Sequence, residues 1–126
     1  MLKDKKATAT LPATDLERAK KFYTEKLGLD VVMVSPGMIM VGAGGGTMVG
    51  LYERPTGTKA DHTAIGFDVD NVESEVEELK SKGVTFEEYD MPDMGIKTVD
   101  GIATMGDWKA AWFKDTEGNI LSINQM

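Results

Sequence analysis

Few side chains in this sequence combine a type and a spacing suited to catalysis or metal binding. The chain has a single histidine, His62, and no cysteine. This excludes disulfides, cysteine nucleophiles and any metal site that needs several imidazole or thiolate ligands. General acid–base chemistry needs a carboxylate or an imidazole tuned inside a cavity, and the candidates are Glu53, Glu87, Asp90 and His62. No two of these have a spacing that marks them as a pair, so the sequence predicts no catalytic residue.

A second group of side chains is suited to binding a small molecule. The chain contains nine methionines, two tryptophans and three tyrosines. Methionine forms adaptable apolar surfaces, and aromatic rings bind by stacking and by cation–π contact. We interpret part of this set as the wall of a metal-free cavity for a hydrophobic or cationic organic ligand, the alternative being that these residues fill the core or a dimer interface. The predicted ligand-binding residues are Met40, Met48, Tyr52, Tyr89, Met91, Met105, Trp108 and Trp112.

Length and charge limit the class of protein. The chain has 126 residues, of which 41% are hydrophobic, and we expect one domain with a real core. The net charge of −7 is uneven: residues 1–58 carry eight basic and six acidic residues, and residues 59–126 carry six and fifteen. This balance argues against nucleic-acid binding, and it indicates an acidic, solvated face or a preference for a cationic ligand. No apolar run is long enough for a membrane span or a signal peptide, so a cytoplasmic location is expected.

Two segments have the periodicity of amphipathic helices. Residues 13–29 place Asp15 at the N-cap, and residues 68–84 place Asn71 there. Gly28 and Gly83 follow as C-terminal stops. Apolar residues recur at spacings of three and four in both segments, namely Leu16, Ala19, Tyr23 and Leu27 in the first and Val72, Val76 and Leu79 in the second.

The sequence around these helices reads as two copies of one unit. Each helix lies between runs of strand-forming residues, so each half is predicted to be β-α-β-β-β. The predicted fold class is α+β, a single domain of two modules, about 1–58 and 59–126, that form a cupped mixed sheet with the helices outside. The expected strands are 6–11, 29–34, 37–41 and 47–52, then 63–69, 84–89, 109–114 and 119–124.

The second half contains an additional stretch, residues 90–107. Its prolines and glycines indicate a loop excursion, with a short strand near 102–105 as an option. The stretch is too apolar for a purely solvated loop, so a lid over a binding site and a mobile surface insert are both open interpretations.

Two motifs resemble those of a known superfamily. The first is LPATDLERA at 11–19 with Phe22, Tyr23 and the LGL of 27–29, and the second is the turn FKDTEGN at 113–119. Together they resemble the vicinal oxygen chelate superfamily of glyoxalases, bleomycin-resistance proteins and extradiol dioxygenases. The resemblance implies two β-α-β-β-β modules that form a cupped sheet around a ligand cavity, usually in a dimer.

The resemblance also identifies where the enzymes of the superfamily hold a divalent metal. The corresponding positions here are Thr8, Gly50, Ala64 and Ser122, which offer no imidazole or carboxylate. Glu53 lies close to the second of these positions. His62 lies two residues before Ala64 and is interpreted as a partly exposed histidine at the start of a strand. We therefore expect no metal and no other cofactor.

The function predicted from these observations is a small-molecule-binding protein of the bleomycin-resistance type. We expect a homodimer with no nucleic-acid or membrane partner. The alternative is a glyoxalase-like enzyme, a lyase, isomerase or dioxygenase, with displaced metal ligands or with acid–base residues in the cavity. A third interpretation is an interaction module without a cavity.

Overall fold

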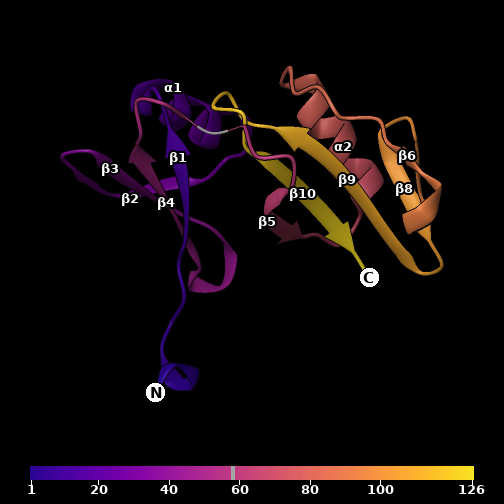
Figure 1. The fold of residues 1–126 in the computed structure, drawn as a ribbon, viewed down its shortest axis with the longest axis horizontal. Helices are drawn as coiled ribbons and strands as arrows, with labels where there is room; N and C mark the ends of the chain where they lie inside the picture. The colour runs from indigo at the N-terminus through magenta and orange to yellow at the C-terminus, as the bar shows by residue number, and fades with distance from the viewer. Residues whose placement is uncertain (58) are drawn as a thin grey trace. The chain divides into compact units, whose positions relative to one another are not determined.

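The computed structural model describes residues 1–57 and 59–126. The chain divides into two compact units, Met1–Gly57 and Thr58–Met126, each with one open, mixed sheet and its own helix (Figure 1). The boundary lies one residue before the predicted module boundary. Whether the two units behave as a single domain stays a prediction.

The first unit is built on a four-stranded sheet with the strand order β1-β4-β3-β2. β1 and β4 are parallel, and the other neighbours are antiparallel. In chain order the elements are η1 (Leu2–Asp4), β1 (Ala9–Ala13), α1 (Leu16–Lys21), η2 (Phe22–Lys26), β2 (Asp30–Ser35), β3 (Met38–Gly42), η3 (Gly44–Gly46) and β4 (Met48–Glu53).

The core of the first unit lies between the sheet and α1. Strand register places Leu11, Leu51 and Ile39 in one row across β1, β4 and β3, and all three are buried. Ala19 and Tyr23 are fully buried and supply the helical side of this core. Alternation along a strand puts every second residue on one face, which explains why a single face of each strand is apolar and enclosed.

The first helix confirms its predicted N-cap but not its predicted length. The Asp15 carboxylate accepts a hydrogen bond from the Arg18 backbone N–H at 3.0 Å. The regular α-helix ends at Lys21, and the chain continues as a π-helical turn over Phe22–Lys26. This wider turn changes the angular phase of the side chains, so Phe22 is buried beside Tyr23, with the ring centroids 5.6 Å apart. The regular spacing had not placed Phe22 in the stripe.

The second unit is built on a six-stranded sheet with the strand order β5-β10-β9-β8-β7-β6. β5 and β10 are parallel, and the other neighbours are antiparallel. Its elements are β5 (Thr63–Asp68), α2 (Val72–Ser81), β6 (Asp90–Met91), η4 (Pro92–Met94), β7 (Ile96–Val99), β8 (Ile102–Met105), β9 (Trp108–Lys114) and β10 (Ile120–Gln125).

The second helix confirms the sequence pattern. Asn71 caps it, because the side-chain oxygen accepts the Ser74 backbone N–H at 2.9 Å. The Val72 N–H, another backbone donor of the first turn, donates a hydrogen bond to the side-chain oxygen of Gln125 in β10 at 2.8 Å. The predicted stripe of Val72, Val76 and Leu79 is buried, and α2 packs on β9 and β10.

Two strand predictions in the second unit were wrong. Residues 84–89 form no strand and make only one isolated bridge, between Phe86 and Phe113. The predicted loop excursion at 90–107 instead contains β6, β7 and β8, and the optional strand near 102–105 is confirmed as β8. The sheet orders β1-β4-β3-β2 and β5-β10-β9-β8 correspond, so β8 is the counterpart of β2 and takes the place expected for 84–89.

The fold class is confirmed as α+β with a repeated strand order. In the part of the chain described, no helix has the length and the apolar character needed to cross a bilayer.

Candidate functional site

The candidate site lies on the face of the six-stranded sheet that α2 does not cover. Alternation along β9 separates Ala111 and Phe113 from Ala110 and Trp112. Phe113 is fully buried and packs edge-on against Phe86. Trp112 belongs to a different apolar cluster, which contains none of the buried side chains of α2. We call the face that carries Trp112 the open face.

The open face carries an aromatic cluster centred on Trp112. The Tyr89 ring packs edge-on against Trp112 with centroids 5.4 Å apart, and Trp108 does so at 6.4 Å. Edge-to-face pairs at these separations are favourable beyond the area that they bury. The cluster continues over neighbouring strands through Ile96, Ala103, Ala110 and Ile120, with Met91 and Met105 packed against it.

Tyr89 is held in this cluster by contacts with β7, although it belongs to no strand. The Thr98 hydroxyl accepts the Tyr89 backbone N–H at 2.7 Å, and the Thr98 N–H donates to the Tyr89 carbonyl at 2.8 Å. The same hydroxyl donates to the Glu88 carboxylate at 2.9 Å. Thr98, which is 7% exposed, therefore fixes the backbone from which the Tyr89 ring projects.

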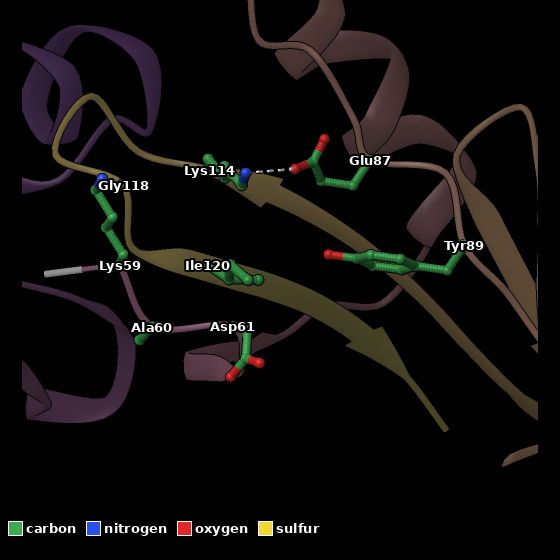
Figure 2. Close-up of a pocket in the computed structure, with 8 residues that line it drawn as sticks. All are labelled: Lys59, Ala60, Asp61, Glu87, Tyr89, Lys114, Gly118 and Ile120. Atoms are coloured by element: carbon green, nitrogen blue, oxygen red, sulfur yellow. Dashed lines mark ion pairs between the residues drawn. The ribbon is translucent and has the colours of Figure 1, made fainter.

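Two adjoining hollows lie over this cluster. The apolar hollow has a volume of about 340 Å³ and is lined by Asp61, His62, Thr63, Tyr89, Met91, Met94, Ile96, Trp112 and Ile120. The polar hollow has a volume of about 470 Å³ and is lined by Lys59, Ala60, Asp61, Glu87, Tyr89, Lys114, Gly118 and Ile120 (Figure 2). Because Asp61, Tyr89 and Ile120 line both hollows, we treat them as one groove with an apolar end and a polar end.

The polar end of the groove contains a paired charge and a phenol. The Lys114 ammonium lies 3.3 Å from the Glu87 carboxylate. Partial burial raises the pKa of the Tyr89 hydroxyl, and the nearby Glu87 carboxylate raises this pKa further. Tyr89 is therefore protonated at neutral pH and presents a hydrogen-bond donor.

The structure brings together five of the eight predicted ligand-binding residues. Tyr89, Met91, Met105, Trp108 and Trp112 all belong to the cluster on the open face. The other three, Met40, Met48 and Tyr52, are half-buried in β3 and β4 of the first unit. Their role in binding stays a prediction.

The acid–base candidates have different surroundings. Glu87 lines the polar hollow and is paired with Lys114. His62 is exposed, lines the apolar hollow and has its Nδ1 3.3 Å from the Thr63 carbonyl oxygen. Glu53 ends β4 and Asp90 begins β6, and both are exposed.

The positions that correspond to metal ligands do not fit a divalent ion. Thr8 is exposed and precedes β1, while Gly50 and Ala64 have no donor atom in their side chains. The Ser122 hydroxyl accepts a hydrogen bond from the Asn124 amide at 3.0 Å. Within residues 1–57 and 59–126, no three His, Cys, Asp or Glu side chains are grouped as metal ligands would be.

Sequence reasoning missed several residues that line the groove. Ile96 and Ile120 complete its apolar floor, and Lys59 and Lys114 supply its charge. The strand pattern of 119–124 already indicated that Ile120 and Ser122 share a face. No local pattern distinguished these lysines from solvated ones.

Comparisons with known proteins place the chain among related folds. A family model described as Glyoxalase/Bleomycin resistance protein/Dioxygenase superfamily matches residues 7–123. A comparison with curated protein sequences gave no significant match. The solved structure of TnmS3, an antibiotic binding protein from Streptomyces sp. CB03234, is similar with a TM-score of 0.75 and 24% identity, over 99% of this chain and 98% of that one.

Two further solved structures are similar at lower identity. The fosfomycin resistance protein FosX from Listeria monocytogenes has a TM-score of 0.72 and 15% identity, over 95% of this chain and 89% of that one. Lactoylglutathione lyase from Agrobacterium tumefaciens has a TM-score of 0.69 and 19% identity, over 99% and 96% of the two chains. At these identities the similarity shows the shared fold.

Proposed function

The chain belongs to the glyoxalase/bleomycin resistance protein/dioxygenase superfamily, and from this premise we propose that it is a binding protein for an apolar, ring-containing organic molecule. The ligand would lie in the groove on the open face of the second unit, without a metal. The single observation that carries the proposal is the aromatic cluster of a buried Trp112 and the half-buried rings of Tyr89 and Trp108, beside a hollow of about 340 Å³.

The dimensions and the lining of the groove support this proposal. A hollow of this size is at the lower end of those that hold drug-sized molecules, which are lined mainly by apolar and aromatic side chains with a few polar groups. Met91 and Met94 at the rim are flexible and polarisable, so they suit rings of different shape. The similarity in fold to an antibiotic binding protein supports the binding of a small organic molecule.

The test is an isothermal titration calorimetry experiment in which the protein is titrated with 2-naphthamide, a planar, uncharged aromatic probe. We expect Trp112→Ala to weaken binding about tenfold or more, since a stacking surface and two edge-to-face contacts are lost. Met91→Glu, at a half-buried position on the rim, checks the result with less disturbance of the core. Val99→Ala, at a position 66% exposed outside the groove, is the control.

The proposal is rejected if wild-type protein does not bind the probe, or if the folded Trp112 and Met91 variants bind it as tightly as the Val99 control. Circular dichroism confirms that each variant is folded.

We further propose that the protein is a homodimer that associates through β2. This strand is at the edge of the four-stranded sheet. Its apolar side chains Val31, Val32, Met33 and Val34 are 38%, 58%, 50% and 65% exposed. A strand edge with free backbone groups and apolar side chains on both faces favours pairing with a second strand. A second copy of β2 offers the same apolar edge. Pairing of the two strands would complete the backbone hydrogen bonds and cover the apolar side chains.

Sedimentation equilibrium tests the dimer. The double variant Val32→Lys/Val34→Lys should shift the protein to monomer, while Val99→Lys, which adds charge to an exposed position of the second unit, should not. A wild-type protein that stays monomeric at high concentration contradicts the proposal.

The enzymatic alternative has weaker support. Of the acid–base candidates, only Glu87 and His62 line the groove, and Glu87 is held by Lys114. Elemental analysis of purified protein addresses the metal directly, because a stoichiometric divalent ion would favour this alternative. The cytoplasmic location stays an expectation, which cell fractionation tests.

A further inference from the structure

The two ends of the groove differ in chemistry. The apolar end is lined by rings and by the side chains of Met91 and Ile96, whereas the charged residues that line the polar end are Lys59, Asp61, Glu87 and Lys114. A molecule that lies across the shared residues Asp61, Tyr89 and Ile120 places one part in each end. The groups at the polar end therefore select the substituent that a bound ring carries.

The polar end is lined by two lysines and by the carboxylates of Glu87 and Asp61, and one of the two ammonium groups, that of Lys59, is unpaired among the described residues. Lys114 is neutralised by Glu87 at 3.3 Å. Within the described parts of the chain, Lys59 has neither a hydrogen-bond nor an ion-pair partner. Figure 2 shows the Lys59 side chain extended toward Gly118, at the same end as the Lys114 ammonium. The Asp61 carboxylate points away from both Lys114 and Tyr89.

The phenol of Tyr89 adds a second donor. Figure 2 shows its hydroxyl directed into the hollow above Ile120. The described residues offer this hydroxyl no hydrogen-bond partner. An ammonium and a neutral phenol both donate hydrogen bonds, so each of them matches an acceptor oxygen, and an anionic oxygen best of all. Figure 2 shows the two donors on different sides of the hollow, so they meet different parts of a bound molecule.

The overall charge of the unit does not oppose this local match. Residues 59–126 carry a net charge of −9, but four of these carboxylates, Glu73, Glu75, Glu77 and Glu78, lie on α2, which packs on the other face of the sheet. Screening limits the reach of exposed charges to roughly 10 Å at 0.1 M salt. Contacts inside the groove therefore decide which ligand is preferred.

We propose that the ligand of this groove is an aromatic organic anion, whose ring lies against Tyr89 at the apolar end and whose carboxylate or ionised hydroxyl lies at the polar end, where it accepts a hydrogen bond from the Lys59 ammonium. This inference rests on the proposed function and makes it more specific. Of the two ligand classes expected from the sequence, hydrophobic and cationic, the inference disfavours the cationic class.

Three probes with the same ring and different charge test the inference: 2-naphthoate, 2-naphthamide and (2-naphthyl)trimethylammonium. In calorimetric titrations at pH 7 and low salt, we expect naphthoate to bind about tenfold more tightly than naphthamide and the ammonium probe to bind least, since a charge-assisted hydrogen bond is roughly twice as strong as a neutral one.

Lys59→Met should weaken naphthoate binding about five- to tenfold and change naphthamide binding less than about twofold. Lys59 is exposed, so this variant is expected to fold. Lys80→Met, which removes the same charge from the exposed surface of α2, should leave naphthoate binding unchanged and so separates the local contact from net charge.

The inference is overturned, and the proposed function stands, if the ammonium probe binds as tightly as naphthoate or if Lys59→Met weakens all three probes equally. Both fail if no probe binds folded wild-type protein. A selective loss of naphthoate affinity in Lys59→Met confirms the anion contact.

Discussion

Replacing Thr98 with valine tests how the groove obtains its shape. Valine has nearly the same volume as threonine but neither donates nor accepts a hydrogen bond. The change leaves the Tyr89 backbone N–H without the acceptor that it has at 2.7 Å, while the exposed Glu88 carboxylate can turn to water. An unsatisfied buried donor costs about 1–3 kcal/mol, so we expect a loss of about 2 kcal/mol in the free energy of unfolding.

This loss is measurable by thermal denaturation. For a chain of this length, about 2 kcal/mol corresponds to a fall in Tm of roughly 8 °C. The Tyr89 ring would also lose its fixed position on Trp112, and an edge-to-face contact is worth about 0.5–1.5 kcal/mol. We therefore expect the affinity for 2-naphthamide to fall about threefold or more.

A matched substitution provides the control. Thr104 of β8 is exposed, and Thr104→Val should change the free energy of unfolding by less than about 0.5 kcal/mol. If Thr98→Val and Thr104→Val melt at the same temperature and bind the probe equally, then the Thr98 hydroxyl does not position Tyr89 and the argument is refuted.

Two further predictions concern the framework of the second unit. Asp115→Ala should lower the free energy of unfolding by about 3 kcal/mol, since the buried carboxylate accepts the backbone N–H groups of Glu117 and Asn119, each at 2.8 Å, and the Asn119 amide at 2.8 Å; urea denaturation measures this, and a loss no larger than that of the exposed Asp93→Ala would contradict it. Lys109→Met should raise the pKa of Glu73, because the hydrogen bond from Lys109 is the largest cause of its depressed value. A depressed carboxyl pKa stabilises the fold above the unfolded-state pKa, and this contribution is lost as pH falls through the folded-state value, so any Tm difference between wild type and Lys109→Met should shrink on acidification. NMR titration checks the shift, and an identical Glu73 titration in both proteins would show that the pair has no effect.

The helix predictions succeeded because their causes are local. A cap and the donors that it satisfies are three residues apart, and an apolar stripe repeats within one segment, so Asn71 and the stripe of α2 were identifiable from neighbouring residues alone. The first helix departed from the pattern only where the π-helical turn at Phe22 changed the phase of the side chains.

The strand predictions failed where the cause is a distant partner. Residues 84–89 have strand-forming side chains, but the place in the sheet next to β9 is occupied by β8. A strand is stable only with a neighbour that completes its hydrogen bonds, and the 84–89 segment instead uses the Thr98 side chain, the Trp112 carbonyl and one bridge. Nothing within residues 84–89 indicates whether this segment or residues 102–105 will pair with β9.

The chemistry available to the protein was determined by the sequence alone. The sequence has one histidine and no cysteine, and it predicts methyl, hydroxyl or hydrogen side chains at the positions that the resemblance assigns to a metal, so the sequence alone led to the prediction of binding by rings and methionines. Which of these residues meet was decided by tertiary structure. Tyr89 and Trp112 are far apart in the chain, and a lysine from the start of the second unit shares a hollow with one from β9, because sheet pairing brings separate segments to one face.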